Sequence, residues 1–324
     1  MKILFNKVLS LDSALNLLLL IFVSIGLTLS PSGLTKNSKT PYEIIAKAPD
    51  SAWRPINLEQ SLYITLETGI VVVEMATQFA PNHVSNTKAL VRAGVFNNTS
   101  FYRVIDGFVA QGGPVELSET DKSQAESSTK TYTGKLTIDA EFTIASEIPF
   151  AFTPLNGFDG YADEVGYVGG YAAGRSKDKK TNWLLHCYGA FAMGRANEAN
   201  SGGTELYIVI GSAQRYLDRN TTVFGRVIAG MEHIQALQRS TNLSGPVNMS
   251  GKNKIISIQV GSDVKGQQQL PLQIMKTDSD SFRALIASRK NRRGEWFLHQ
   301  HDYIDVCSVA IPSRLINNKK ATNE

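Results

Sequence analysis

Side chains that could bind a metal ion are concentrated near the end of the chain, in the segment FLHQHDYIDVC. If this segment is a strand, alternate residues share one face, which would bring together His299, His301, Asp305 and Cys307. Imidazole, carboxylate and thiolate groups are the ligands that zinc prefers. A short tail that packs on the domain with its polar side in water accounts for the same pattern. We therefore expect no metal site and no cofactor.

A cysteine nucleophile is a second possibility, because His186 and Cys187 are neighbours. Adjacent residues point to opposite sides of a strand, which disfavours a thiol–imidazole pair. The sequence also lacks G-x-S-x-G, a phosphate-binding glycine loop and a dinucleotide fingerprint, so hydrolase, kinase and dehydrogenase functions have no support. The two cysteines, Cys187 and Cys307, either form a disulfide bond in an oxidising compartment or lie buried as separate thiols.

Arg103 is the third candidate, within the run FYRVIDGFVAQGG. Taken alone, an arginine between two strands is most often a partner in a surface ion pair. Apolar residues such as Phe108, Met193, Leu206 and Leu217 are, on periodicity alone, ordinary core. Any site that they form has to be assembled by the surrounding strands.

Composition and charge describe a folded protein that is not built to bind nucleic acid. The 324 residues are 42% hydrophobic and carry a formal net charge of +4. No block of Lys and Arg could neutralise a run of phosphates. Residues 1–33 differ, because Lys2 and Lys7 precede an apolar run from Ala14 to Leu29. This is typical of a secretory signal, with an uncleaved membrane anchor as the alternative. We expect a periplasmic or otherwise exported monomer whose only membrane contact would be this segment.

The rest of the chain predicts a mainly β domain over 58–262. Prolines at 41, 49 and 55 indicate an extended linker over 34–57. Runs at 61–65 and 70–75 predict a hairpin, and a helix begins at Pro81 and ends before Gly94. Further strands are expected within 101–113, 189–193, 205–210, 222–228 and 254–260, with a second helix at 230–238. Many strands and two helices favour a closed antiparallel barrel with helical caps. An insertion at about 114–186, polar at its start, and an extension at 263–324 complete the chain.

The order of these motifs resembles the cyclophilin-type peptidyl-prolyl cis-trans isomerases. FYRVIDGFVAQGG is similar to the family signature F-H-R-x-I-x-G-F-x-x-Q-G-G, and GAFAMGRANEANSGGTELYIVIG and YLDRNTTVFGRVIAGMEHIQAL resemble two later family segments. WLLHCYG, GGTELYIVIG and the terminal tail look most like a secreted Gram-negative subgroup. The resemblance covers about two thirds of the chain, and it implies an eight-stranded barrel that binds proline-containing polypeptides.

What the resemblance implies about the site is specific. Arg103 would donate a hydrogen bond to the prolyl nitrogen, and Gln111 or a backbone carbonyl would hold the arginine in place. The proline pocket would be formed by Phe108, Met193, Leu206 and Leu217. Arg103, Phe108 and Gln111 are the expected catalytic residues. The expected substrate-binding residues are Phe101, Met193, Gly194, Arg195, Glu205, Leu206, Tyr216, Leu217 and Thr221.

Several positions depart from the family pattern. The substitutions are Tyr102 for His, Asp106 for Pro, Gly194-Arg195 for Ala-Asn, Glu205 for Gln, Leu206 for Phe, Tyr216 for Trp and Thr221 for His. Glu205 and Arg195 would place opposite charges beside a bound peptide. Two hypotheses follow: an exported prolyl isomerase that assists folding, or a module with the same fold that holds proline segments or a partner protein without useful turnover.

Overall fold

The computed structural model describes residues 39–114, 134–145, 151–240, 253–292 and 296–316. By its contacts the chain divides into Met1–Lys39 and Thr40–Glu324. Of the first unit only Lys39 is described, so the signal or anchor expected at 1–33 lies outside the described residues, as does most of the polar stretch that opens the insertion. Within the described ranges, no helix has the length and apolar character needed to cross a bilayer.

Eight antiparallel strands form the barrel, in the order β14–β2–β3–β13–β11–β12–β5–β4. The two edge strands approach each other where Ser100 bridges Lys254 and the amide of Phe101 donates to the carbonyl of Asn253 at 2.9 Å. The expectation of a mainly β fold with an eight-stranded barrel is therefore confirmed, with closure nearly complete. The strands are β2 (Ser61–Leu66), β3 (Gly69–Met75), β4 (Ser100–Val104), β5 (Val109–Gly113), β11 (Ala190–Met193), β12 (Leu206–Val209), β13 (Thr222–Ala229) and β14 (Ile255–Val260).

Apolar residues on alternate positions fill the barrel. Leu62 and Ile64 of β2 and Val71 and Val73 of β3 belong to one interior cluster, in which Phe224 is also fully buried. The residues between them on the same strands belong to a second apolar cluster outside the barrel. Strands that bury both faces read as continuous apolar runs, which explains the sequence IVVVEM.

Two helices pack on the barrel where the sequence predicts them. Helix α3 (Pro81–Arg92) begins with proline in its first turn and buries Val84, Leu90 and Val91 in the interior cluster. Gly94 follows with φ of 75°, a left-handed conformation that glycine adopts without strain. Helix α5 (Met231–Gln235) is shorter and buries Ile234.

The insertion builds a second sheet, which no clear pattern in the sequence predicts. Its order is β6–β10–β9–β8–β7. The strands are β6 (Ile144–Ala145), β7 (Thr153–Pro154), β8 (Glu164–Val168), β9 (Tyr171–Arg175) and β10 (Thr181–Leu184). Val168, Tyr171 and Leu184 from this sheet share a buried cluster with Val209 and Val223 of the barrel. The insertion therefore packs directly on part of the barrel's outer surface.

The expectation of an extended linker is wrong from Thr40 onward. Helix α2 (Pro41–Ala46) starts with a capping box between Thr40 and Glu43, and β1 (Trp53–Pro55) pairs with β15 (Leu272–Met275). Proline is favoured in the first turn of a helix and tolerated on an edge strand, so here prolines start one element and end another. Strand β16 (Ser313–Leu315) completes this three-stranded sheet.

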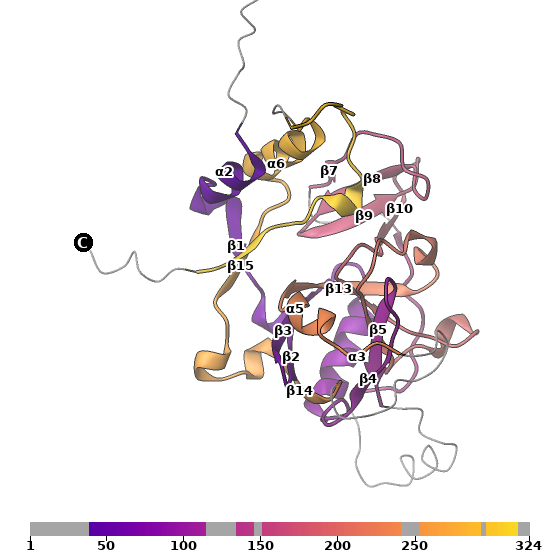
Figure 1. Cartoon of the computed structure of the whole chain (residues 1–324). Helices are drawn as coiled ribbons and strands as arrows, with labels where there is room; N and C mark the ends of the chain where they lie inside the picture. Colours follow the sequence, from indigo (N-terminus) through magenta and orange to yellow (C-terminus); the bar gives the residue numbers. More distant parts are fainter. Residues whose placement is uncertain (1–38, 115–133, 146–150, 241–252, 293–295, 317–324) are drawn as a thin grey trace, which may run out of the picture. The chain divides into compact units, whose positions relative to one another are not determined.

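A second core unites the segment before the barrel, the insertion and the C-terminal extension. Helix α2 lies beside helix α6 (Asp280–Lys290) (Figure 1). Trp53, Tyr167 and Phe282, one from each of the three segments, belong to the same buried cluster. The C-terminal extension is thus part of a folded layer rather than a simple tail.

The strand considered for FLHQHDYIDVC is also absent. Among the described residues of this segment, the only regular element is the single 3-10 turn η7 (Val306–Ser308). His299 and His301 are exposed, and Cys307 forms a disulfide bond with Cys187, 120 residues earlier in the chain. Of the two alternatives that the sequence left open, a disulfide bond or two separate buried thiols, the structure has the disulfide bond.

Candidate active site

One row of side chains crosses the outer face of the barrel. Arg103 in β4 stands opposite Gln111 in β5, and Gln111 stands opposite Tyr207 in β12. The row continues through Ala192 in β11 to Val223 in β13. Directly opposed residues in an antiparallel sheet point to the same face, so strand pairing alone brings these five side chains into line.

Arg103 is held in place without an opposing charge. Its Nη1 donates to Oε1 of Gln111 at 3.2 Å, as the sequence predicts, and its Cζ lies 5.7 Å from the centroid of the Phe108 ring. None of the described carboxylates forms an ion pair with it. A guanidinium presents five N–H donors in a rigid fork. Arg103 is therefore a positioned cation that can donate hydrogen bonds to a ligand.

Glu205 lies beside this pair and changes its chemistry. The hydroxyl of Tyr102 donates to Glu205 Oε2, while Nε2 of Gln111 donates to the Tyr102 hydroxyl at 3.0 Å and approaches Glu205 Oε2 at 3.4 Å. Burial raises the pKa of Glu205 from its ordinary value to about 7. Near neutral pH the site therefore contains a carboxyl group that is partly protonated.

Gly194 forms the wall next to Gln111 and Glu205. A Cβ at this position would lie 3.0 Å from Cβ of Glu205 and 3.3 Å from Nε2 of Gln111. A larger residue would press on both side chains, so glycine leaves the backbone of this strand open to a ligand.

Three expected binding residues point the other way. Phe101, Met193 and Leu206 all belong to the interior cluster of the barrel. Leu206 pairs with Met193, and this pair is adjacent to the pair of Tyr207 and Ala192 in the outer row. A shift of one residue along a strand moves a side chain to the opposite face of the sheet. They therefore support the site from inside and do not line its outer surface.

Tyr207 is the residue that the sequence analysis missed. It shares a buried cluster with Val109 and Val223, against which Phe108 packs. Its aromatic ring is placed where we expected Leu206 to line the proline pocket. Strand alternation was the signal, because an inward Leu206 and Ile208 require an outward Tyr207.

The remaining expected residues lie at the rim. Nε of Arg195 donates to the carbonyl of Asn220 at 2.7 Å and Nη1 donates to the carbonyl of Ala196 at 2.8 Å, so this guanidinium is engaged by backbone rather than by Glu205. Arg195 keeps its charge, because the carbonyls that it contacts are neutral, so the effect of the two opposite charges on a bound peptide stays a prediction. Tyr216 is 56% exposed and Leu217 is half-buried.

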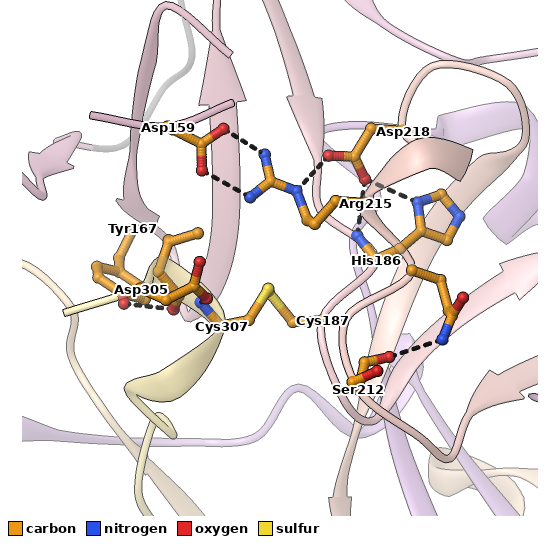
Figure 2. The surroundings of a disulfide bond; sticks show 11 residues. Asp159, Tyr167, His186, Cys187, Ser212, Arg215, Asp218, Asp305 and Cys307 are labelled. Carbon is orange, nitrogen blue, oxygen red and sulfur yellow. Dashed lines mark hydrogen bonds and ion pairs between the residues drawn. A yellow bond between two sulfur atoms is a disulfide. The ribbon is translucent and has the colours of Figure 1, made fainter. Parts of the chain in front are cut away.

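A buried hydrogen-bonded network supports the Tyr207 side of the site. Nε2 of His186 lies 2.8 Å from the hydroxyl of Tyr207 and 2.9 Å from Oγ1 of Thr221. Its Nδ1 lies 2.9 Å from Oδ1 of Asp218, and Arg215 donates from Nε to the other oxygen of Asp218 at 2.6 Å (Figure 2). Thr221, expected to bind substrate, therefore acts together with His186 in fixing Tyr207.

The same network reaches the insertion. Arg215 donates from Nη1 and Nη2 to the two carboxylate oxygens of Asp159 at 2.8 and 2.9 Å (Figure 2). The pKa of Asp159 is lowered by these hydrogen bonds, although burial opposes the effect. The disulfide bond between Cys187 and Cys307 begins at the residue that follows His186. Insertion and extension are thus both attached next to one wall of the site.

Comparison with known proteins identifies this arrangement. The family model for the cyclophilin type peptidyl-prolyl cis-trans isomerase matches residues 61–260, which span the barrel and the insertion within it. The chain belongs to this family. The match ends with the last barrel strand, so α2, β1 and the C-terminal extension lie beyond this cyclophilin barrel.

Individual relatives agree with the assignment. A probable peptidyl-prolyl cis-trans isomerase of Brucella suis is 26% identical over 208 residues, which cover 64% of this chain and 85% of the relative. The human peptidyl-prolyl cis-trans isomerase-like 1 is 32% identical over 107 residues, covering 33% of this chain and 61% of the relative. The crystal structure of a cyclophilin from Hirschia baltica matches with a TM-score of 0.64 and 24% identity, over 86% of this chain and 97% of that one. The last similarity includes most of the segments outside the barrel and bears on the fold alone.

Proposed function

We propose that this cyclophilin catalyses rotation about X-Pro peptide bonds and assists the folding of exported polypeptides. The observation that carries the proposal is Arg103, which Gln111 orients beside Phe108 and which has no ion-pair partner among the described residues. Such a group is available for a ligand that must be bound by hydrogen bonds.

The reaction needs no covalent step. Amide resonance sets a barrier of about 18–20 kcal/mol to rotation about the peptide bond. As the bond twists, the prolyl nitrogen becomes pyramidal and regains its lone pair. A hydrogen bond from Arg103 to that nitrogen would be strongest at this point and would lower the barrier. Guanidinium suits the role because it stays protonated at any working pH.

The proline ring would be held by the aromatic surface of the site. Phe108 and Tyr207 supply apolar faces next to Arg103, and Gly194 leaves space for the peptide backbone. Leu217 is half-buried at the rim and would contact the residue beside proline. This assignment replaces the inward Met193 and Leu206 with Tyr207.

Two features support an exported location. The apolar segment within 1–33 has the composition of a secretory signal or anchor. Disulfide bonds persist in oxidising compartments and are rare in the cytosol, and the chain's two cysteines are paired. Cell fractionation, together with titration of free thiols in the recovered protein, tests this part of the proposal. A cytosolic protein with two free thiols would contradict it.

The catalytic proposal is tested with Arg103→Ala. We expect its kcat/KM on an Ala-Pro peptide, followed by NMR exchange between the cis and trans forms, to fall about 10²-fold, the usual effect of removing one transition-state donor. Arg283→Ala is the matched control, because Arg283 is an exposed residue of α6. Equal rates for wild type and Arg103→Ala would contradict the role of Arg103. Peptide resonances that shift without faster exchange in the wild type would favour the alternative, a binding module.

A further inference from the structure

A second cavity lies away from Arg103, Phe108 and Gln111. Its volume is about 360 Å³, and it is bounded by β13, the start of α5 and the C-terminal segment around Cys307. Most lining side chains are apolar, among them Leu184, Leu185, Val227, Met231, Val309 and Ile311. Cavities of this size and character are typical of small-molecule sites in which a few polar groups fix the ligand.

Arg226 of β13 is a cationic residue in the cavity wall. Its Nε donates to the carbonyl of Gly170 at 2.7 Å, whereas its Nη2 is buried and has no hydrogen-bond partner among the described residues. Burial lowers the pKa of Arg226, although nearby Glu74 opposes the shift. A guanidinium in such surroundings is costly unless an anion compensates it.

The nearest acidic residue already has a different partner. Glu74 stands opposite Arg226 in the sheet, but both of its carboxylate oxygens accept from Arg54, at 2.7 and 2.8 Å. The hydroxyl of Tyr171 also donates to Glu74, at 3.3 Å. One carboxylate therefore lies between two guanidinium groups, and the described residues leave one positive charge uncompensated.

From this geometry we infer that the cavity binds a small monocarboxylate with an apolar tail. Arg226 as a whole is half-buried although its Nη2 is fully enclosed, so the carboxylate would approach the guanidinium from its accessible side. The tail would fill the apolar part of the cavity. Glu232 also lines the cavity, but its side chain is 76% exposed at the mouth, so water screens its repulsion. This site is separate from the proposed isomerase site, because neither Arg103 nor Gln111 lines it.

Octanoate is the probe that tests the inference, and octanol is the matched ligand without charge. Isothermal titration of the full chain should give a dissociation constant for octanoate at least tenfold lower than for octanol. Thermal unfolding should show a rise in Tm with octanoate concentration, because a ligand that binds only the folded state stabilises it by mass action. Equal affinity for octanol, or no binding of octanoate at millimolar concentration, would overturn the inference.

Two variants locate the site. Arg226→Met keeps an unbranched apolar stem without the charge and should weaken octanoate binding at least tenfold, while binding of octanol stays unchanged. Ala310 is exposed and also lines the cavity, so Ala310→Phe should fold normally and block the space. This second variant decides the question if Arg226→Met does not fold. Octanoate binding equal to wild type in Ala310→Phe, or in folded Arg226→Met, would contradict the inference.

Discussion

The residue that most distinguishes this site is Glu205. The family pattern has glutamine at this position, and an amide offers both a donor and an acceptor. A protonated carboxyl offers the same two functions, whereas a carboxylate accepts only. Because burial raises the pKa of Glu205 to about 7, the site changes between these two states near neutral pH.

We predict that kcat/KM falls as pH rises through about 7. Below that pH neutral Glu205 resembles the amide; above it the anion attracts Arg103 away from the prolyl nitrogen. Glu205→Gln should remove this dependence, and a profile equal to wild type would contradict it.

The linked effect on stability has the same direction. A raised pKa means that the folded state retains a proton that the unfolded state releases, so the contribution of Glu205 to stability is greatest below about pH 4.5 and is lost as pH rises to about 7. Urea unfolding across this range measures the decline, which Glu205→Gln should lack.

The sequence predicts those site residues that lie close together along the chain. Arg103, Phe108 and Gln111 lie in one signature, and the cross-strand pairing of Arg103 with Gln111 follows from a hairpin of that length. The choice of Leu206 over Tyr207 failed because it depended on which face of a strand points inward. A family pattern does not state that face, whereas the apolar alternation of the strand does.

At the scale of elements, the supporting network joins parts of the chain that no local pattern connects. Asp159 comes from the insertion, His186 precedes β11, and Arg215 and Asp218 follow β12. Hairpins and helices were predictable because their patterns span a few residues. His186 and Asp218 are 32 residues apart and Asp159 and Arg215 are 56 apart, so only the folded chain reveals these two contacts.

Asp218→Ala should test this network. Asp218 accepts from the backbone amide and the ring of His186 and from Arg215, and it is 6% exposed. Its removal leaves a buried imidazole and part of a guanidinium without their acceptor, which should cost about 3 kcal/mol. Urea unfolding measures the loss, and Asp278→Ala, at an exposed position, is the control. A loss below about 1 kcal/mol would show that Asp159 alone satisfies Arg215.

For the whole molecule, the sequence predicts the barrel but not the second core. Each segment outside the barrel lacks enough apolar residues to form a core by itself, so the prolines at 41, 49 and 55 suggested an extended linker, and the C-terminal residues suggested a short tail packed on the domain. Trp53, Tyr167 and Phe282 are buried only because three segments meet. The expected monomer and the exported location stay predictions, to be measured by light scattering and by fractionation.

The Cys187–Cys307 bond should contribute strongly to overall stability. It closes a loop with a sequence separation of 120, for which the loss of unfolded-state entropy corresponds to about 5 kcal/mol. The double variant Cys187→Ala/Cys307→Ala should therefore unfold at lower urea concentration than the oxidised protein. Reduced wild type should behave like the double variant. If the oxidised protein and the variant unfolded together, the bond would have no role in stability.

The packing of α2 against α6 also constrains the order in which the protein can mature. A chain that leaves a ribosome or a translocation pore N-terminus first delivers α2 more than 230 residues before α6, since the helices begin at Pro41 and Asp280. During that interval the barrel can already close, while the apolar side of α2 still lacks α6 as its packing partner. We therefore expect assembly in two stages, in which a nascent chain halted before α6 would carry a closed barrel and an exposed, aggregation-prone leading helix.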